Sequence, residues 1–314
     1  DLQVKPIWDE PVNGQITLDA REAQALAPLF PGLERAKGLL GLEFAMSGSA
    51  RDPAITARVR ARQVQLQAYP AMDLDVDVAY KEGQAAMVSR SRVGSAPFAT
   101  LDARLKLNLS QVLQGGELRL SDLRAALDIT RFDLMQLPPV IRGPQLRGGV
   151  LTLRALLESQ TVTPTFQLLT VVDGLSVGEA KDHRVELTGA YQADSVQLSG
   201  RVTSGSILQA ELAGAVPLEL RLPLNGGQTR VDYGQGLNVR VNIPGLDVSL
   251  ANAFLPNQAS IGGVLRGHVG LTGALDAPDV QGALKLTRGQ VFLPAQGVYY
   301  DQIRLASEFT RAHL

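Results

Sequence analysis

The sequence predicts an all-β protein, and three observations carry this prediction. Apolar and polar residues alternate along most of the chain, turn residues separate the alternating runs, and one arrangement of strand, turn and proline occurs three times. A period of two is typical of strands that bury one face, whereas helical periodicity over long stretches is nearly absent. We therefore expect successive strands to be antiparallel neighbours, with at most a few short helices.

The recurring arrangement has a spacing of about 112 residues. Its copies run from Gly38 to Pro53, from Gly149 to Pro164 and from Gly263 to Pro278. The first and third copies match without a gap and share a turn glycine, Gly48 or Gly273, which the middle copy lacks. A recurrence of this kind indicates an array of similar units and not a single catalytic pocket.

The recurrence divides the chain into a first unit at 1–130 that begins with a short helix, a second at 131–246 and the start of a third at 247–314. The chain begins at Asp1, without a methionine, and ends just after another alternating run. We therefore expect one continuous array that is part of a longer chain.

The alternating runs place apolar and polar side chains on opposite faces. From Met72 to Tyr80 the apolar residues alternate with Asp73, Asp75 and Asp77, so the carboxylates point away from the apolar side. Other runs of this kind lie at 55–61, at Leu101 to Leu109, at 218–222 and at 237–243. Glycine-rich turn signals separate runs at 115–116, 225–227 and 234–236.

Three short amphipathic helices are expected, one at the start of each unit. Asp19 and Glu22 form a candidate capping box for the first, which Pro31 ends. The others are expected at 132–137 and 247–255, each followed by a proline. Most helices of this kind cover the end of a core, and the alternative is that they gate or plug an opening.

Composition limits the functional classes. The 314 residues carry a net charge of −1 and 45% hydrophobic residues, which is not the composition of a disordered chain. No apolar run reaches the ~18 residues that a membrane-spanning helix needs. Because the sequence has no cysteine, a disulfide framework, a thiolate metal site and a cysteine nucleophile are excluded.

The segments that resemble a known family are Gly263 to Gly267, Leu271 to Pro278, Gly282 to Leu286, Gly289 to Val291 and Pro294 to Asp301. They contain glycine-spaced strands, a Thr-Gly turn that ends in proline, and a later strand end with a Leu-Pro pair. This pattern is similar to the repeat of the TamB family, which belongs to the AsmA-like group of bridge-like lipid-transfer proteins. The stretch 38–53 matches second best, and the middle copy departs most.

The resemblance implies an elongated, U-shaped β-solenoid (a β-taco) with an apolar inner groove. It also implies a conduit that carries phospholipid across the periplasm between the inner and outer membranes, in a parent chain anchored in the inner membrane. A TamA-like outer-membrane barrel is the implied partner. The alternative function is a scaffold or chaperone for the assembly of outer-membrane proteins and autotransporters.

Physical reasoning from the residues leaves three ways to cover the apolar face. A second sheet makes an ordinary sandwich, a sheet folded on itself has a core filled by side chains, and incomplete closure lets acyl chains supply the missing contacts. Each methylene moved onto an aliphatic surface gains ~0.8 kcal/mol, so a long acyl chain needs no head-group contact. A purely structural solenoid, such as an adhesin stalk, stays open as a further reading.

The candidate groove residues are the apolar members of the alternating runs. They are Met72, Leu74, Val76, Val78, Leu101, Leu105, Leu107, Leu109, Leu151, Leu153, Leu218, Leu220, Leu222, Leu237, Val239, Val241, Leu265, Val269 and Leu271.

No motif indicates catalysis, a metal, a cofactor or nucleic acid, and we expect a protein that is not an enzyme. Strand alternation spreads Asp73, Asp75 and Asp77 at ~7 Å intervals, a poor first shell for a metal ion. The histidines at 183, 268 and 313 have no metal-binding spacing, and arginines at 58, 60 and 62 form a row on the outward face. Trp8 and the pair 299–300 are candidates for a membrane-interface or partner contact, although such aromatics more often close a core.

Overall fold

The protein folds as one antiparallel sheet of 17 strands that is not closed, with three short helical segments among the described residues. The computed structural model describes residues 10–20, 22, 36–49, 51–66, 71–113, 120–137, 145–160, 162–222, 224, 230–253, 255, 259–275 and 277–313. The predicted all-β class is confirmed, and every strand pair whose register is resolved is antiparallel.

The chain divides into two compact units. Unit 1 comprises residues 1–129, 156–164 and 221–229, and unit 2 comprises residues 130–155, 165–220 and 230–314.

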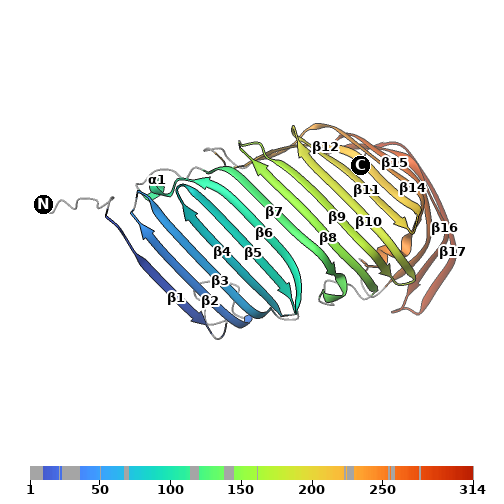
Figure 1. Cartoon of the computed structure of the whole chain (residues 1–314). Coiled ribbons are helices and arrows are strands. Elements are labelled where there is room, and N and C mark those ends of the chain that lie inside the picture. Colours follow the sequence, from blue (N-terminus) through green and yellow to red (C-terminus); the bar gives the residue numbers. More distant parts are fainter. Residues whose placement is uncertain are drawn as a thin grey trace. The chain divides into compact units, whose positions relative to one another are not determined.

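In unit 1 the strands lie side by side in chain order (Figure 1). Each pairs with the next, from β1 through β7. The elements are β1 (Gly14–Ala20), β2 (Ala36–Gly48), β3 (Pro53–Leu66), β4 (Met72–Lys81), β5 (Gln84–Val93), β6 (Ala96–Leu107), α1 (Leu109–Leu113) and most of β7 (Leu120–Asp133).

Unit 2 has the same antiparallel pairing, in chain order from β9 to β12, then from β12 to β14 and on to β17. Its elements are η2 (Leu134–Gln136), most of β8 (Leu146–Ser159), β9 (Thr165–Val177), β10 (Ala180–Gln192), β11 (Ser195–Ser204), β12 (Ile207–Arg221), β13 (Arg230–Tyr233), β14 (Gln235–Asp247), η3 (Val248–Ala253), β15 (Ser260–Ala274), β16 (Pro278–Leu293) and β17 (Val298–His313).

The three copies of the sequence pattern share a backbone irregularity. Where β2 pairs with β3, and where β15 pairs with β16, the register shifts at the first glycine of the copy. Such shifts are β-bulges, which bend and twist a strand locally. In each copy this glycine and the residue 25 positions later both have positive φ: Gly38 and Gln63, Gly149 and Gly174, Gly263 and Arg288.

Two of the expected helices are present as short 3₁₀ segments. The Asp133 carboxylate accepts a hydrogen bond from the Met135 N–H, and the Asp247 carboxylate accepts one from the Ser249 N–H, both at 2.9 Å. Both segments are shorter than predicted, because the strand before each one continues up to the capping aspartate. The first predicted helix stays a prediction, because residues 23–31 lie outside the described part. Asp19, its predicted cap, is in β1 and pairs with Gly41.

Candidate functional site

The strand register of unit 2 brings apolar residues into continuous rows. Residues opposite one another in neighbouring strands point to the same face, and the next residue along each strand points to the other face. One row consists of Leu187, Gly200, Leu212, Val241, Val269, Gly282 and Phe309. The adjacent row, one residue further along, consists of Thr188, Ser199, Ala213, Arg240, Gly270 and Gln281. The sheet of unit 2 therefore has an apolar face and a polar face.

Unit 1 separates its side chains in the same way. An apolar row crosses the sheet at Ile16, Phe44, Ala57, Val78, Met87, Ala103 and Ala125. The next row consists of Thr17, Glu43, Arg58, Asp77, Val88, Asp102 and Ala126. All the charged members of these two rows lie on the second face.

The apolar face is only partly shielded from water. In unit 2 most of its side chains, including Val269, Leu271 and Leu284, are half-buried, and Leu305 on β17 is 61% exposed. All strands of the described residues belong to one sheet, so these residues do not form the two-sheet sandwich that the sequence left open. An aliphatic surface with this exposure retains contact area for a ligand.

Most of the predicted groove residues share these apolar faces. In unit 1 they are Met72, Leu74, Val76 and Val78 on β4 and Leu101, Leu105 and Leu107 on β6. In unit 2 they are Leu218 and Leu220 on β12, Leu237, Val239 and Val241 on β14, and Leu265, Val269 and Leu271 on β15. Leu151 and Leu153 lie on one face of β8. Contact of any of them with lipid stays a prediction.

Two of the predicted groove residues do not lie in strands. Leu109 begins α1, because the Asn108 side chain accepts a hydrogen bond from the Gln111 N–H at 3.2 Å and caps the helix there. Leu222 follows the last residue of β12. The alternation of the sequence continues past the ends of both strands, so it did not reveal where they stop.

A hollow of about 370 Å³ opens on the apolar face of unit 2, between η3 and the strands β15, β16 and β17. Its apolar lining consists of Val248, Ile261, Leu265, Leu284, Leu286, Val291, Ile303 and Leu305. Of these, only Leu265 was predicted. The alternation of apolar and polar residues along β16 and β17 would have been sufficient to predict Leu284, Leu286, Ile303 and Leu305. Val248 was not predictable in this way, because it lines the hollow only through the docking of η3.

Asn252 holds η3 against β15. Its side-chain amide donates to the Ile261 carbonyl at 2.8 Å, and its Oδ1 accepts from the Ile261 N–H at 2.8 Å. Asn252 is 2% exposed, so both hydrogen bonds are shielded from water. The same short helix also contacts β9, which lies several strands away from β15 in the sheet.

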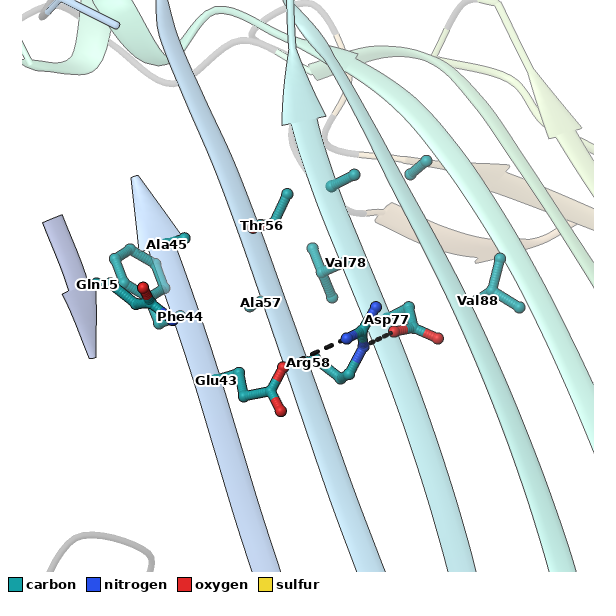
Figure 2. A pocket seen from close by; sticks show the side chains of 12 residues that line it. Gln15, Glu43, Phe44, Ala45, Thr56, Ala57, Arg58, Asp77, Val78 and Val88 are labelled. Atoms are coloured by element: carbon teal, nitrogen blue, oxygen red, sulfur yellow. Dashed lines mark hydrogen bonds and ion pairs between the residues drawn. The ribbon is translucent and has the colours of Figure 1, made fainter. Parts of the chain in front are cut away.

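The polar face of unit 1 has a second hollow, of about 520 Å³, where Glu43, Arg58 and Asp77 meet (Figure 2). The Arg58 Nε lies 2.7 Å from the Asp77 Oδ1, and its Nη1 lies 3.3 Å from the Glu43 Oε2. Hydrogen bonding to Asp77, together with the charges of both carboxylates, raises the pKa of Arg58. Arg58 thus engages both carboxylates that line this hollow.

The three predicted carboxylates of β4 are also engaged. Asp75 forms an ion pair with Arg62 at 2.6 Å, Asp77 forms one with Arg58, and the Asp73 carboxylate accepts from the Gln63 N–H at 2.7 Å. The predicted row of arginines thus lies opposite a row of aspartates. Within the described residues, no three His, Asp or Glu side chains come together in a way that could hold a metal ion.

The histidines do not form a site. His183 on β10 is 3% exposed and neither ring nitrogen has a hydrogen-bond partner, whereas His268 on β15 is exposed. His313 is the last residue of β17.

None of the helices in the described part of the chain is long and apolar enough to cross a membrane. A scan against models of protein families finds no match to this chain, and searches of curated proteins and of solved structures find none either.

Proposed function

We propose that this chain binds the acyl chains of phospholipids along the apolar face of its sheet and forms part of a passive conduit between the inner and outer membranes. The observation that carries the proposal is the set of continuous apolar rows, in register across β10 to β17, whose side chains stay half-buried. The TamB resemblance supplies the cellular setting, the periplasm, and the barrel partner. Both of these stay predictions.

Removal of apolar surface from water is the driving force for this binding. Apolar surface that leaves water gains about 25 cal/mol for each Å². Valine, leucine and glycine dominate the rows, so an acyl chain meets aliphatic groups at every strand that it crosses. Few polar side chains on this face are available to select a head group, and binding is expected to follow chain length more than lipid class.

We infer further that the sheet of unit 2 curves into a trough around this face, as the β-solenoid prediction requires. The contacts of η3 support this inference, because η3 touches both β9 and β15. Neighbouring strands are about 4.8 Å apart, and five such steps separate β9 from β15, so a flat sheet would place them roughly 24 Å apart. The six residues of η3 make about two turns of 3₁₀ helix, roughly 12 Å long, so contacts with both strands favour a sheet that bends toward η3.

The proposal needs no catalytic group, metal or cofactor, since movement along an aliphatic surface breaks no covalent bond. The polar face, with its cross-strand ion pairs in unit 1, remains in water. Direction and driving force would come from the membranes at either end.

Adjacent residues of β16 allow a matched test. Leu284 lines the hollow and Lys285 is exposed on the opposite face. We expect native mass spectrometry of detergent-free protein to detect bound phospholipid in the wild type and in Lys285→Glu, and to detect little in Leu284→Glu, where a carboxylate lies on the apolar face. Circular dichroism establishes that both variants fold.

A photo-crosslinker at Leu286 gives an independent readout on the same face. It should capture phospholipid in cells. A lipid-free wild-type spectrum, or crosslinks to a protein strand and none to lipid, would overturn the proposal in favour of a scaffold for strand assembly.

A further inference from the structure

The end of the β16–β17 hairpin carries three exposed aromatic residues. Phe292 is 42% exposed, Tyr299 is 56% exposed and Tyr300 is 55% exposed. The turn residues between the two strands, 294–297, are exposed as well. Most large aromatic side chains are largely buried in a folded protein, so three exposed ones at one hairpin end are unusual.

The strict separation of apolar and polar faces breaks down at this end of the hairpin. Tyr300 lies opposite Val291, which lines the apolar hollow, so Tyr300 belongs to the apolar face. Phe292 and Tyr299 lie opposite each other one residue away and therefore on the other face. Their rings pack edge to face at 6.5 Å. The hairpin end is thus apolar on both faces, unlike the rest of β16 and β17.

Charge is excluded from the same segment. Residues 289–300 contain no Asp, Glu, Lys or Arg, and the first charged residues on either side are Arg288 and Asp301. The turn satisfies part of its own backbone, since the Gln296 N–H donates to the Leu293 carbonyl at 3.1 Å and the Gly297 N–H donates to the Pro294 carbonyl at 3.2 Å. These features lower the cost of moving the turn out of water.

We propose that this aromatic hairpin end, residues 291–300, inserts into the interface of a lipid bilayer. Tyrosine and phenylalanine suit the boundary between head groups and acyl chains, because the ring is apolar and the tyrosine hydroxyl stays hydrated. Arg288 and Arg304, both exposed, flank the uncharged segment at a level where anionic head groups attract cations.

Adjacency to the hollow favours a bilayer over a protein partner. Val291 belongs to both features: it lines the hollow and directly precedes Phe292. A hairpin seated in a bilayer would bring the mouth of the hollow to the depth at which acyl chains begin. This choice of partner rests on the proposed function, whereas the exposure, the pairing and the absence of charge do not.

Vesicle flotation tests the proposal directly. With vesicles of phosphatidylethanolamine and phosphatidylglycerol, we expect the wild type to float and the triple variant Phe292→Ser, Tyr299→Ser, Tyr300→Ser to partition at least tenfold less. The matched control is Leu169→Ser, Ile207→Ser, Val231→Ser, which removes three exposed apolar side chains elsewhere in unit 2 and should float like the wild type. A wild type that stays in the soluble fraction, or two triple variants that lose partitioning equally, would overturn the proposal.

Two further measurements separate this inference from the proposed function. Tyr300→Trp in a Trp8→Phe background should show a blue shift of tryptophan emission when vesicles are added, and an unchanged spectrum would contradict insertion. Native mass spectrometry of the double variant Phe292→Ser, Tyr299→Ser, which changes only the face opposite the hollow, should still detect bound phospholipid, because the apolar rows are intact. If the aromatic variants no longer float but still bind lipid, both the hairpin insertion and the lipid conduit are supported. If the wild type floats but no bound lipid is detected, the lipid conduit is ruled out and the hairpin insertion is retained.

Discussion

The hydroxyl of Tyr191 accepts a hydrogen bond from the backbone N–H of Leu220 at 2.8 Å, across 29 residues of chain. Tyr80 does the same for Leu109, also 29 residues further on, at 3.2 Å. Both tyrosines are buried, with exposed fractions of 3% and 6%. The segments 1–130 and 131–246, which the sequence predicts as the first two units, therefore share a side-chain anchor that the recurring pattern did not reveal.

Removing either anchor should destabilise the fold. Tyr191→Phe keeps the ring but leaves the Leu220 N–H without the hydroxyl, and we expect the free energy of unfolding to fall by about 1–3 kcal/mol. Tyr80→Phe should have an effect of similar size. Urea denaturation followed by circular dichroism measures both. Tyr299→Phe, at an exposed position, is the control and should change stability by no more than about 0.5 kcal/mol. Equal effects at all three positions would argue against an anchoring role.

The bulge at the start of the third copy should accept only glycine. Gly263 has φ +125°, and a Cβ there would lie 2.9 Å from the Gly289 Cα and 3.0 Å from the Arg288 carbonyl oxygen. We expect Gly263→Ala to cost more than about 2 kcal/mol, because both φ and the close backbone approach are unfavourable for alanine. Gly270→Ala in the same strand is the control, since its Cβ would come no closer than 3.8 Å. Thermal and urea unfolding compare the two, and a neutral Gly263→Ala would show that the bulge relaxes.

The facing of unit 1 is testable on neighbouring residues of β6. Leu105 lies opposite Ala85 on the apolar face, and Lys106 is exposed and pairs with Asp122 at 2.6 Å. We expect Leu105→Glu to reduce phospholipid transfer between donor and acceptor vesicles by at least tenfold, because a carboxylate then interrupts the aliphatic surface. Lys106→Glu should leave transfer nearly unchanged. If both variants, once shown to fold, lost transfer to the same extent, the assignment of the faces would be wrong.

Stability at acid pH should depend weakly on Asp75. The hydrogen bond from Arg62 lowers the pKa of Asp75, burial opposes that shift, and the charges of Arg62, Arg60 and Arg92 add to it. Because the folded-state pKa lies below the unfolded value of about 3.9, the pair stabilises the fold above that value and loses its effect as the pH falls through the lower, folded-state pKa. The side chains of Asp75 and Arg62 are 37% and 39% exposed, so the contribution should stay below about 1 kcal/mol.

Asp75→Asn provides the measurement. Wild type and variant should differ in urea midpoint at neutral pH and converge once the pH falls below the folded-state pKa of Asp75, where both carry a neutral side chain. High salt should shrink the neutral-pH difference, since exposed ion pairs are screened. A difference that grew on acidification would have the wrong sign for this ion pair.

Alternation in the sequence was sufficient to predict which side chains of a strand share a face. Leu74, Val76 and Val78 lie together on β4, and Asp75 and Asp77 lie on the other face, because the pleat reverses the side-chain direction at every residue. Strand ends were less predictable. Leu109 continued the pattern and yet begins a helix, because one capping side chain, Asn108, outweighs one further alternating residue.

The sequence by itself determined that the protein is made of antiparallel strands with one apolar face, and that a pattern of strand, turn and proline occurs three times, since both follow from local spacing along the chain. Only the tertiary structure decided that the apolar faces of separate strands line up into rows, because register depends on bulges and turns that pair residues far apart in sequence. It also decided where the hollow lies, through the docking of η3 by Asn252, and which aromatic residues stay uncovered. Burial is a property of the packed chain, and no local pattern specifies it.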